Sequence, residues 1–209
     1  MRVNGIILAA GMSKRMGEFK PLLQINKKTM IEQSIDCMLE SGVETITLVL
    51  GFQGKKIEEV LEKGSNKKHQ IVTVYNEAYA TTQMLDSVKI GVRNLKECDA
   101  FYLLPGDMPA IHPNTFLKVQ EEMKKQKARI VFPTVEGYRK HPPLIASECI
   151  MDILNFESDG GLRELWKTFK YKIVEVPVDD FGCTLDADTK AQYQSICQYM
   201  NHSWSCQTS

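Results

Sequence analysis

The feature that most constrains this chain is a regular alternation of short apolar runs with longer segments in which apolar residues recur every three or four positions. An uninterrupted apolar run is typical of a strand buried on both faces, whereas the second pattern predicts an amphipathic helix. Strands that alternate with helices form a parallel sheet covered on both sides and joined by right-handed crossovers. We therefore predict a three-layer α/β fold with a mostly parallel, Rossmann-like sheet. The predicted strands span residues 3–9, 45–50, 70–75, 100–104 and 129–133, and the predicted helices span residues 30–40, 55–63, 86–95 and 114–125.

The pattern changes in the second half of the chain. Residues 134–147 are rich in turn formers, and we expect them to begin a small antiparallel elaboration of the sheet. Because the chain has 209 residues and no linker or repeat, we expect one domain over residues 1–200. Residues 201–209 lack periodicity and are expected to form a loosely ordered tail. Two helical patterns and a strand pattern complete this half, at residues 147–154, 162–169 and 172–176.

The charges and cysteines narrow the class of protein. Lys and Arg together number 26, as do Asp and Glu, so the formal net charge is zero. This balance predicts neither a nucleic acid nor a membrane as partner, since both attract an excess of positive charge. The six cysteines form no CxxC pair and are widely spaced, which is typical neither of a zinc site nor of a compact disulfide framework. With no signal-peptide pattern, these features predict a cytoplasmic protein.

A glycine followed by basic residues comes directly after the first predicted strand. Ligands of open α/β sheets bind beyond the carboxyl ends of the strands. At this place Gly11 lets backbone N–H groups approach an anion, and Ser13 can donate a hydroxyl hydrogen bond. Arg15 and Lys20 supply positive charge for a polyphosphate. The spacing fits neither the Walker loop nor the dinucleotide fingerprint. An ordinary strand-to-helix turn with basic surface residues would look the same, and the loop taken alone favours that interpretation.

Carboxylates suited to a metal ion occur in two places. Asp107 follows a predicted buried strand, where it would face the same crevice as the glycine loop. Magnesium prefers oxygen ligands and bridges to substrate phosphates, so a second carboxylate is expected, and Asp186 and Asp188 offer two. Each has an alternative role: Asp107 as a turn residue, and Asp186 or Asp188 as the N-cap of the helix that follows.

The segment LAAGMSKRMG at residues 8–17, followed by KPLL at residues 20–23, resembles the signature of the MobA-like nucleotidylyltransferases. LPGDMP at residues 104–109 and LDADTKAQY at residues 185–193 resemble the magnesium-binding segments of that family. The resemblance implies the nucleotide-diphospho-sugar transferase type of fold and a loop that binds a nucleoside triphosphate.

The same resemblance implies roles for individual residues. Asp107 and Asp188 would hold Mg²⁺, with Asp186 as the next candidate, and Arg15 and Lys20 would neutralise charge as pyrophosphate leaves. The expected catalytic residues are therefore Arg15, Lys20 and Asp107. The expected nucleotide-binding residues are Leu8, Ala9, Ala10, Gly11, Ser13, Arg15, Lys20, Asn76, Ser87, Pro105 and Gly106.

Two further segments resemble the molybdenum cofactor cytidylyltransferases within this family. YRKHPPLI at residues 138–145 is similar to their G-H-P-V-L-F segment, and SDGGLREL at residues 158–165 is similar to their G-D-x-G-A-R-x-L-L segment. The resemblance implies CTP as donor, the phosphate of molybdopterin as acceptor, and a molybdoenzyme as receiver of the product. The expected acceptor-binding residues are His141, Pro142, Asp159 and Arg163.

Departures from the family pattern keep other interpretations open. Lys140 replaces the glycine before the histidine, Pro143 replaces a valine, and residues 76–87 lack the glycine of the base-binding stretch. Nucleotidyl transfer to another phosphorylated acceptor, such as a sugar phosphate, is therefore one alternative. A non-catalytic protein that handles a cofactor is another. His141 could simply be a packed residue, and Arg163 a salt-bridge partner.

The expected reaction is in-line attack by an acceptor phosphate oxygen on the α-phosphorus of the nucleotide. Positioning and charge neutralisation do most of the work in such transfers. An acceptor phosphate is already an anion near neutral pH, so the reaction requires no general base.

Overall fold

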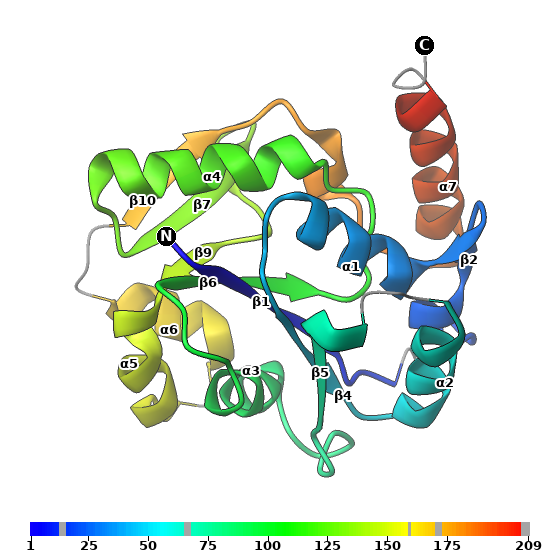
Figure 1. Ribbon diagram of the computed structural model, residues 1–209, viewed down its shortest axis with the longest axis horizontal. Helices are drawn as coiled ribbons and strands as arrows, with labels where there is room; N and C mark the ends of the chain where they lie inside the picture. The colour runs from blue at the N-terminus through cyan, green and yellow to red at the C-terminus, as the bar shows by residue number, and fades with distance from the viewer. Residues whose placement is uncertain (13–15, 65–67, 159, 170–172, 206–209) are drawn as a thin grey trace.

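The computed structural model is built around an eight-stranded sheet with the strand order β10-β7-β9-β6-β1-β4-β5, in which β8 pairs with β7 (Figure 1). The structure describes residues 1–12, 16–64, 68–158, 160–169 and 173–205. The strands are β1 (Val3–Ala9), β4 (Ile46–Leu50), β5 (Ile71–Tyr75), β6 (Ala100–Pro105), β7 (Ile130–Val135), β8 (Tyr138–Arg139), β9 (Leu144–Ala146) and β10 (Ile173–Pro177).

Most neighbouring strands of this sheet are parallel, as predicted. β1 pairs in parallel with both β4 and β6, β4 with β5, and β7 with β10. The exceptions are β9, which lies antiparallel between β6 and β7, and β8, which is antiparallel to β7. Both exceptions fall in or beside residues 134–147, so the predicted antiparallel elaboration is confirmed. The strand order also reverses at β1, where open sheets bind their ligands.

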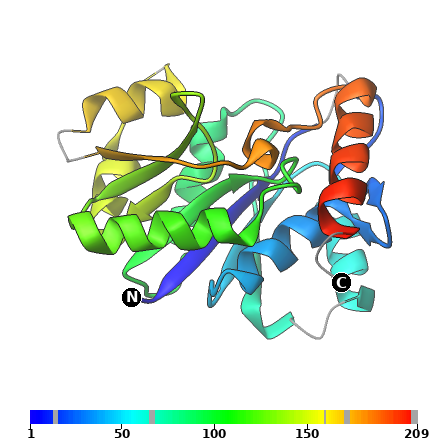
Figure 2. The ribbon, with the colours of Figure 1, turned by 90° about the horizontal axis from the view of Figure 1, so that it is seen from above.

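Helices cover the two faces of the sheet (Figures 1 and 2). Buried apolar side chains of α1 (Met30–Glu40), α2 (Gly54–Gly64) and α4 (Pro113–Gln126) pack in one cluster against one face. Those of α3 (Met84–Arg93), α5 (Ile150–Asn155) and α6 (Gly161–Thr168) pack in a second cluster against the other face. Because apolar strand residues alternate between these two clusters, the sheet is buried on both sides, and the predicted three-layer α/β fold is confirmed.

Local signals explain where individual helices begin. Thr29 caps α1 through a capping box: its hydroxyl accepts from the Glu32 N–H, and the Glu32 carboxylate accepts from the Thr29 N–H at 2.7 Å. In α3, the Asp86 carboxylate accepts from the Gln83 N–H at 2.8 Å. The predicted helices at residues 30–40, 55–63, 86–95 and 114–125 all form, with ends that differ by at most a few residues.

The last helix, α7 (Lys190–Ser205), packs at the opposite end of the molecule from α5 (Figures 1 and 2). Its Ile196 and Met200 are buried in a third apolar cluster, which contains Ile25 and Met30. The helix continues to Ser205, past residue 200, where the loosely ordered tail was predicted to begin. Residues 206–209 lie outside the described part of the chain.

Short elements complete the described structure. Strands β2 (Gln24–Ile25) and β3 (Lys28–Thr29) form a small antiparallel hairpin that leads into α1. Four 3₁₀ turns connect larger elements: η1 (Lys20–Leu22), η2 (Lys68–Gln70), η3 (Ser147–Cys149) and η4 (Phe181–Thr184). Within the described ranges, the helices lack the combination of length and apolarity that crossing a membrane requires.

Candidate active site

The carboxyl ends of β1 and β6 lie side by side and form the base of the candidate site. Leu8 of β1 is in register with Pro105 of β6, and the Gly106 N–H donates to the Leu8 carbonyl at 2.9 Å. A Cβ atom on Gly106 would lie only 3.0 Å from the same carbonyl oxygen. The two strand ends can approach this closely because residue 106 is a glycine, and the chain then delivers Asp107 to the end of the sheet.

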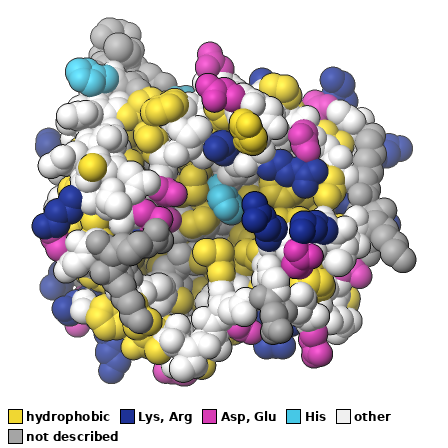
Figure 3. Space-filling view, turned by 180° about the vertical axis from the view of Figure 1, so that it is seen from behind, with side chains coloured by type: hydrophobic (Ala, Val, Ile, Leu, Met, Phe, Trp, Pro, Cys, Tyr) yellow, Lys and Arg dark blue, Asp and Glu magenta, His cyan; other side chains and the backbone are white. Residues whose placement is uncertain are grey.

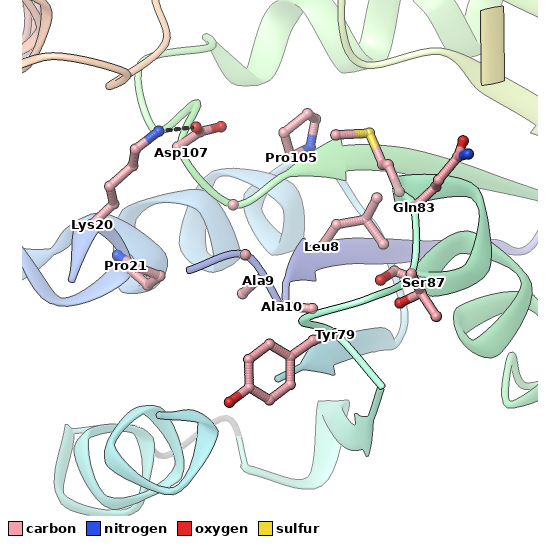
Figure 4. Close-up of a pocket in the computed structure, with 14 residues that line it drawn as sticks. Leu8, Ala9, Ala10, Lys20, Pro21, Tyr79, Gln83, Ser87, Pro105 and Asp107 are labelled. Atoms are coloured by element: carbon pink, nitrogen blue, oxygen red, sulfur yellow. Dashed lines mark hydrogen bonds and ion pairs between the residues drawn. The ribbon is translucent and has the colours of Figure 1, made fainter. Parts of the chain in front are cut away.

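A cavity of about 250 Å³ opens above these strand ends. In Figure 4, Lys20 and Asp107 lie at one end of the cavity and Gln83 and Ser87 at the other, with β1 between them. The lining combines a charged end with a longer, mostly uncharged wall. The residues that line the cavity are Leu8, Ala9, Ala10, Gly11, Lys20, Pro21, Tyr79, Thr82, Gln83, Met84, Ser87, Pro105, Gly106 and Asp107.

The charged end of the cavity is an ion-pair cluster centred on Lys20. Lys20 Nζ lies 3.0 Å from Asp107 Oδ2 and 2.7 Å from Asp188 Oδ1, so one ammonium bridges two carboxylates (Figure 4 draws the Asp107 contact). The Lys20 side chain is 10% exposed, and each carboxylate is 26% exposed. Burial lowers the pKa of Lys20, but its hydrogen bonds to Asp188 and Asp107 and their charges outweigh that effect and raise it overall. Lys20 is therefore positively charged at neutral pH.

The structure separates the roles of Asp186 and Asp188. Asp188 shares Lys20 with Asp107, whereas Asp186 Oδ1 accepts a hydrogen bond from Gln192 Nε2 at 2.6 Å. The Thr189 hydroxyl caps α7 by accepting from the Gln192 N–H at 3.3 Å. The segment is anchored by the Ala187 N–H, which donates to the Asp107 carbonyl at 3.2 Å. Capping therefore leaves the Asp188 side chain available to the cluster.

The number of carboxylates bears on which metal chemistry is feasible. Within the described residues, no cluster of three or more His, Cys, Asp or Glu side chains could hold a metal by itself. Magnesium usually takes one or two protein carboxylates and completes its shell with water and substrate phosphates. Asp107 and Asp188 supply oxygen ligands of this kind, so the residues present fit a magnesium ion that is shared with a phosphate ligand.

Asn76 has a different place from the one that its sequence position suggests. It was expected to contact nucleotide, but it is only 2% exposed and does not line the cavity. Its amide group donates to Thr82 Oγ1 at 2.9 Å and to Ser87 Oγ at 3.0 Å, and its carbonyl oxygen accepts from the Ala78 N–H at 3.1 Å. Asn76 holds the loop 77–82 against α3, because a buried amide must satisfy its hydrogen bonds locally.

The wall that Asn76 holds contains residues that the sequence did not single out. Tyr79, Thr82, Gln83 and Met84 line the cavity, and Met84 is 54% exposed. Tyr79 also contacts Phe52, with ring centroids 6.2 Å apart. The only signal for these residues is their position between Asn76 and Ser87 in the stretch that resembles a base-binding segment. Pro21, beside Lys20, was missed as well.

The predicted acceptor residues do not form one group. His141 is half-buried behind β6, where its Nδ1 lies 3.4 Å from the Leu103 carbonyl oxygen. Burial lowers the pKa of His141, although the hydrogen bond to Leu103 and the charge of Asp107 partly oppose this effect, so the ring is neutral at pH 7. Pro142 is buried. Arg163 is exposed on α6, and no described contact joins it to His141.

The start of α6 nevertheless approaches the cavity. A Cβ atom on Gly161 would lie 3.3 Å from Gln83 Oε1, so α6 begins next to the uncharged wall.

On the face shown in Figure 3, Lys and Arg side chains gather on one side of a histidine and acidic side chains on the other. The face therefore carries both a cation-attracting and an anion-attracting region. Ser13, Arg15 and Asp159, which were predicted to bind phosphate or acceptor, lie outside the described residues.

Known proteins resemble this chain over most of its length. A family model for the MobA-like NTP transferase domain matches residues 5–174. The molybdenum cofactor cytidylyltransferase of Escherichia coli (strain K12) is 29% identical over 187 residues, which cover 90% of this chain and 91% of that protein. The probable molybdenum cofactor guanylyltransferase of Natranaerobius thermophilus is 27% identical over 145 residues, which cover 69% of this chain and 65% of that protein.

Solved structures agree on the fold. A nucleotidyl transferase from Methanothermobacter thermautotroptrophicus superposes with a TM-score of 0.80 at 20% identity, and the match covers 96% of this chain and 98% of that one. The match of the family model over residues 5–174 places this chain in the MobA-like NTP transferase family of nucleotidyltransferases.

Proposed function

We propose that the protein transfers CMP from CTP to the phosphate of molybdopterin and releases pyrophosphate. The observation that carries this proposal is the pair of carboxylates, Asp107 and Asp188, that share Lys20 at one end of the cavity. The cavity extends from this charged end along the end of β1 to an uncharged wall (Figure 4). A nucleoside triphosphate has the same two parts, so its phosphates would lie near Lys20 and its base near Gln83. The similarity to a molybdenum cofactor cytidylyltransferase supports the choice of donor and acceptor.

Asp107 and Asp188 would hold Mg²⁺ together with phosphate oxygens of the nucleotide. When bound, the metal would neutralise charge on the phosphates and so favour attack at the α-phosphorus. Asp186 is the weaker candidate ligand, because its carboxylate accepts from Gln192.

The residues at the strand ends would position the triphosphate. Gly11 lines the cavity, and among the described residues other than its chain neighbours no atom lies within 4 Å of the place where its Cβ would be, so an anion can approach the backbone there. Lys20 would place its ammonium on the phosphates and stabilise the leaving pyrophosphate, together with Arg15. Since the attacking phosphate oxygen is already anionic, these residues need only orient the two phosphates in line and balance their charge.

On the acceptor side, His141 would act as a neutral hydrogen-bonding group and not as a base. Its lowered pKa keeps the ring uncharged, and its position behind β6 brings it near Asp107. Arg163, exposed at the start of α6, would contribute a positive charge for the acceptor phosphate. Asp159 and Pro142 would complete the acceptor side.

The test is a matrix of donors and acceptors. Purified protein with Mg²⁺ is incubated with each of the four ribonucleoside triphosphates and with molybdopterin or a sugar phosphate, and pyrophosphate and the nucleotidylated product are measured. We expect turnover with CTP and molybdopterin. Turnover with GTP instead would change the donor, turnover only with a sugar phosphate would change the acceptor, and no turnover with any pair would refute the proposed function.

A matched pair of variants makes the test specific to the site. Asp107→Asn should lower product formation about 10²- to 10³-fold, whereas Asp152→Asn, on the exposed face of α5, should leave it unchanged. Comparable losses in both variants would show that the effect does not arise from the proposed metal site.

A further inference from the structure

The position of Lys20 between Asp107 and Asp188 affects how the divalent cation and the triphosphate bind. Lys20 Nζ lies 3.0 Å from Asp107 Oδ2 and 2.7 Å from Asp188 Oδ1. Its positive charge allows the two carboxylates to face the same point. Lys20 is carried by a fixed turn: the Leu23 N–H donates to the Lys20 carbonyl at 3.0 Å, and the Met30 N–H donates to the Leu23 carbonyl at 2.8 Å. The head group of Lys20 therefore stands where a cation shared by the two carboxylates would stand.

Each ligand alone would separate charges that this cluster pairs. A free triphosphate would have to draw the Lys20 ammonium away from Asp107 and Asp188, whose negative charges would then face the same point. A divalent cation alone would have to take over the carboxylates and leave the mostly buried Lys20 without its counter-charges, which is unfavourable for a buried ion. When both ligands arrive together, the ammonium moves to the phosphates and the metal takes the carboxylates, so every charge keeps a partner.

We propose that Lys20 occupies the metal position in the ligand-free protein and couples the binding of the divalent cation to that of the triphosphate. This inference rests on the proposed function only in that it takes the triphosphate to bind near Lys20. It makes Lys20 a positioning residue for the metal in addition to a ligand of the phosphates. The affinity of the protein for the metal alone is then kept low by its own lysine.

The direct test measures Mn²⁺ binding without nucleotide, by the loss of the free-ion EPR signal. Lys20→Met removes the charge at similar side-chain length and should bind Mn²⁺ about tenfold more tightly than the unmodified protein, a coupling of ordinary size. Lys20→Arg keeps the charge and should bind as weakly as the unmodified protein. Equal or weaker binding by Lys20→Met would overturn the inference.

Two controls distinguish the loss of the Lys20 bridge between Asp107 and Asp188 from a general loss of positive charge. Lys190 is close to Asp188 in sequence, but its Nζ pairs with Glu18 at 3.5 Å. Lys190→Met should therefore leave the Mn²⁺ affinity unchanged. In the background of Asp188→Asn, the change Lys20→Met should bring no gain, because the pair of carboxylates is already broken. An equal gain from Lys190→Met, or a full gain without Asp188, would contradict the proposed arrangement.

A second measurement uses the unmodified protein, so it does not depend on whether the Lys20 variants fold. Acetylation of Lys20 by a lysine-reactive ester is followed by peptide mass spectrometry, with Lys190 as internal reference. Mn²⁺ alone should raise the relative rate at Lys20 by displacing the ammonium, and Mn²⁺ with tripolyphosphate should lower it again. A rate at Lys20 that does not respond to Mn²⁺ would overturn the inference. Neither measurement involves turnover. Failure of the proposed reaction would therefore be detected separately, by the measurement of pyrophosphate and product.

Discussion

Lys20 and Asp188 lie 168 positions apart in the chain, yet their side chains meet at 2.7 Å. Lys20 reaches this point from a 3₁₀ turn before α1, and Asp188 from the segment before α7. The contact ties the first and last parts of the domain to Asp107 at the end of β6, so the same three charges both join the chain together and define one end of the cavity.

Asp188 should matter far more to turnover than Asp186. Removing one charge from the proposed metal pair, in Asp107→Asn or Asp188→Asn, should lower kcat by about 10²- to 10³-fold, as for loss of a main electrostatic group. Asp186→Asn keeps the residue size and should cost less than about tenfold, because the Asp186 carboxylate accepts from Gln192 and is not joined to Lys20 by an ion pair among the described contacts. Pyrophosphate release at saturating CTP and Mg²⁺ provides the measurement. Equal losses at positions 186 and 188 would restore Asp186 as a ligand.

Asn76→Ala should weaken nucleotide binding without direct loss of a ligand contact. Three hydrogen bonds of the Asn76 side chain hold the loop 77–82 and Ser87 in place, so we expect a loss of about 1–3 kcal/mol in the free energy of unfolding, measured in urea. The KM for CTP should rise more than kcat falls. Ser87→Ala, which removes only one of these bonds, is the matched control and should have a smaller effect on stability. A large change in KM with no change in stability would favour direct contact with nucleotide.

Gly51→Ala and Gly11→Ala should differ in their effect on stability. A Cβ atom on Gly51 would lie 2.6 Å from the Ala10 carbonyl oxygen and 2.8 Å from Tyr79 Cβ, so Ala must push β1 and the cavity wall apart, at about 1–3 kcal/mol. At Gly11, no atom of the described residues beyond its chain neighbours lies within 4 Å of the corresponding position. We expect Gly51→Ala to lower both thermal stability and triphosphate affinity, and Gly11→Ala to lower the affinity alone. If Gly11→Ala leaves the affinity unchanged, the proposed approach of phosphates to this backbone is wrong.

Stability should fall in mildly acidic solution because of His141. Burial lowers the pKa of this histidine from its ordinary value of 6.5, with Leu103 and Asp107 partly opposing the change. Below pH 6.5 the unfolded chain takes up a proton that the folded protein does not, so the free energy of unfolding decreases, by at most about 1.4 kcal/mol per pH unit, until the folded pKa is reached. Urea unfolding at pH 5.5, 6.5 and 7.5 should show this slope. His141→Gln should flatten it, and an unchanged slope in the variant would assign the effect to other groups.

Local pattern was sufficient for most of the fold. The predicted strand at residues 3–9 and the predicted helix at residues 30–40 have the same bounds in the structure, because an apolar run and a helical apolar period are read from neighbouring residues alone. The strand at residues 45–50 begins one position later, at Ile46. The resemblance in the glycine loop also located one end of the cavity: Leu8, Ala9, Ala10, Gly11 and Lys20 all line it.

The tertiary structure decided which side chains meet. From the residues alone Asp186 and Asp188 were both candidates, and only the family resemblance favoured Asp188. The folding of the segment before α7 against Asp107 is what brings Asp188 to Lys20. Likewise, Asn76 reads as a polar residue after a strand, and only its burial against Thr82 and Ser87 makes it a support for the cavity wall. The physical reason is the same in both cases. Sequence pattern determines which backbone hydrogen bonds form locally, whereas the partner of a polar side chain depends on the order of strands and on burial, which bring distant parts of the chain together.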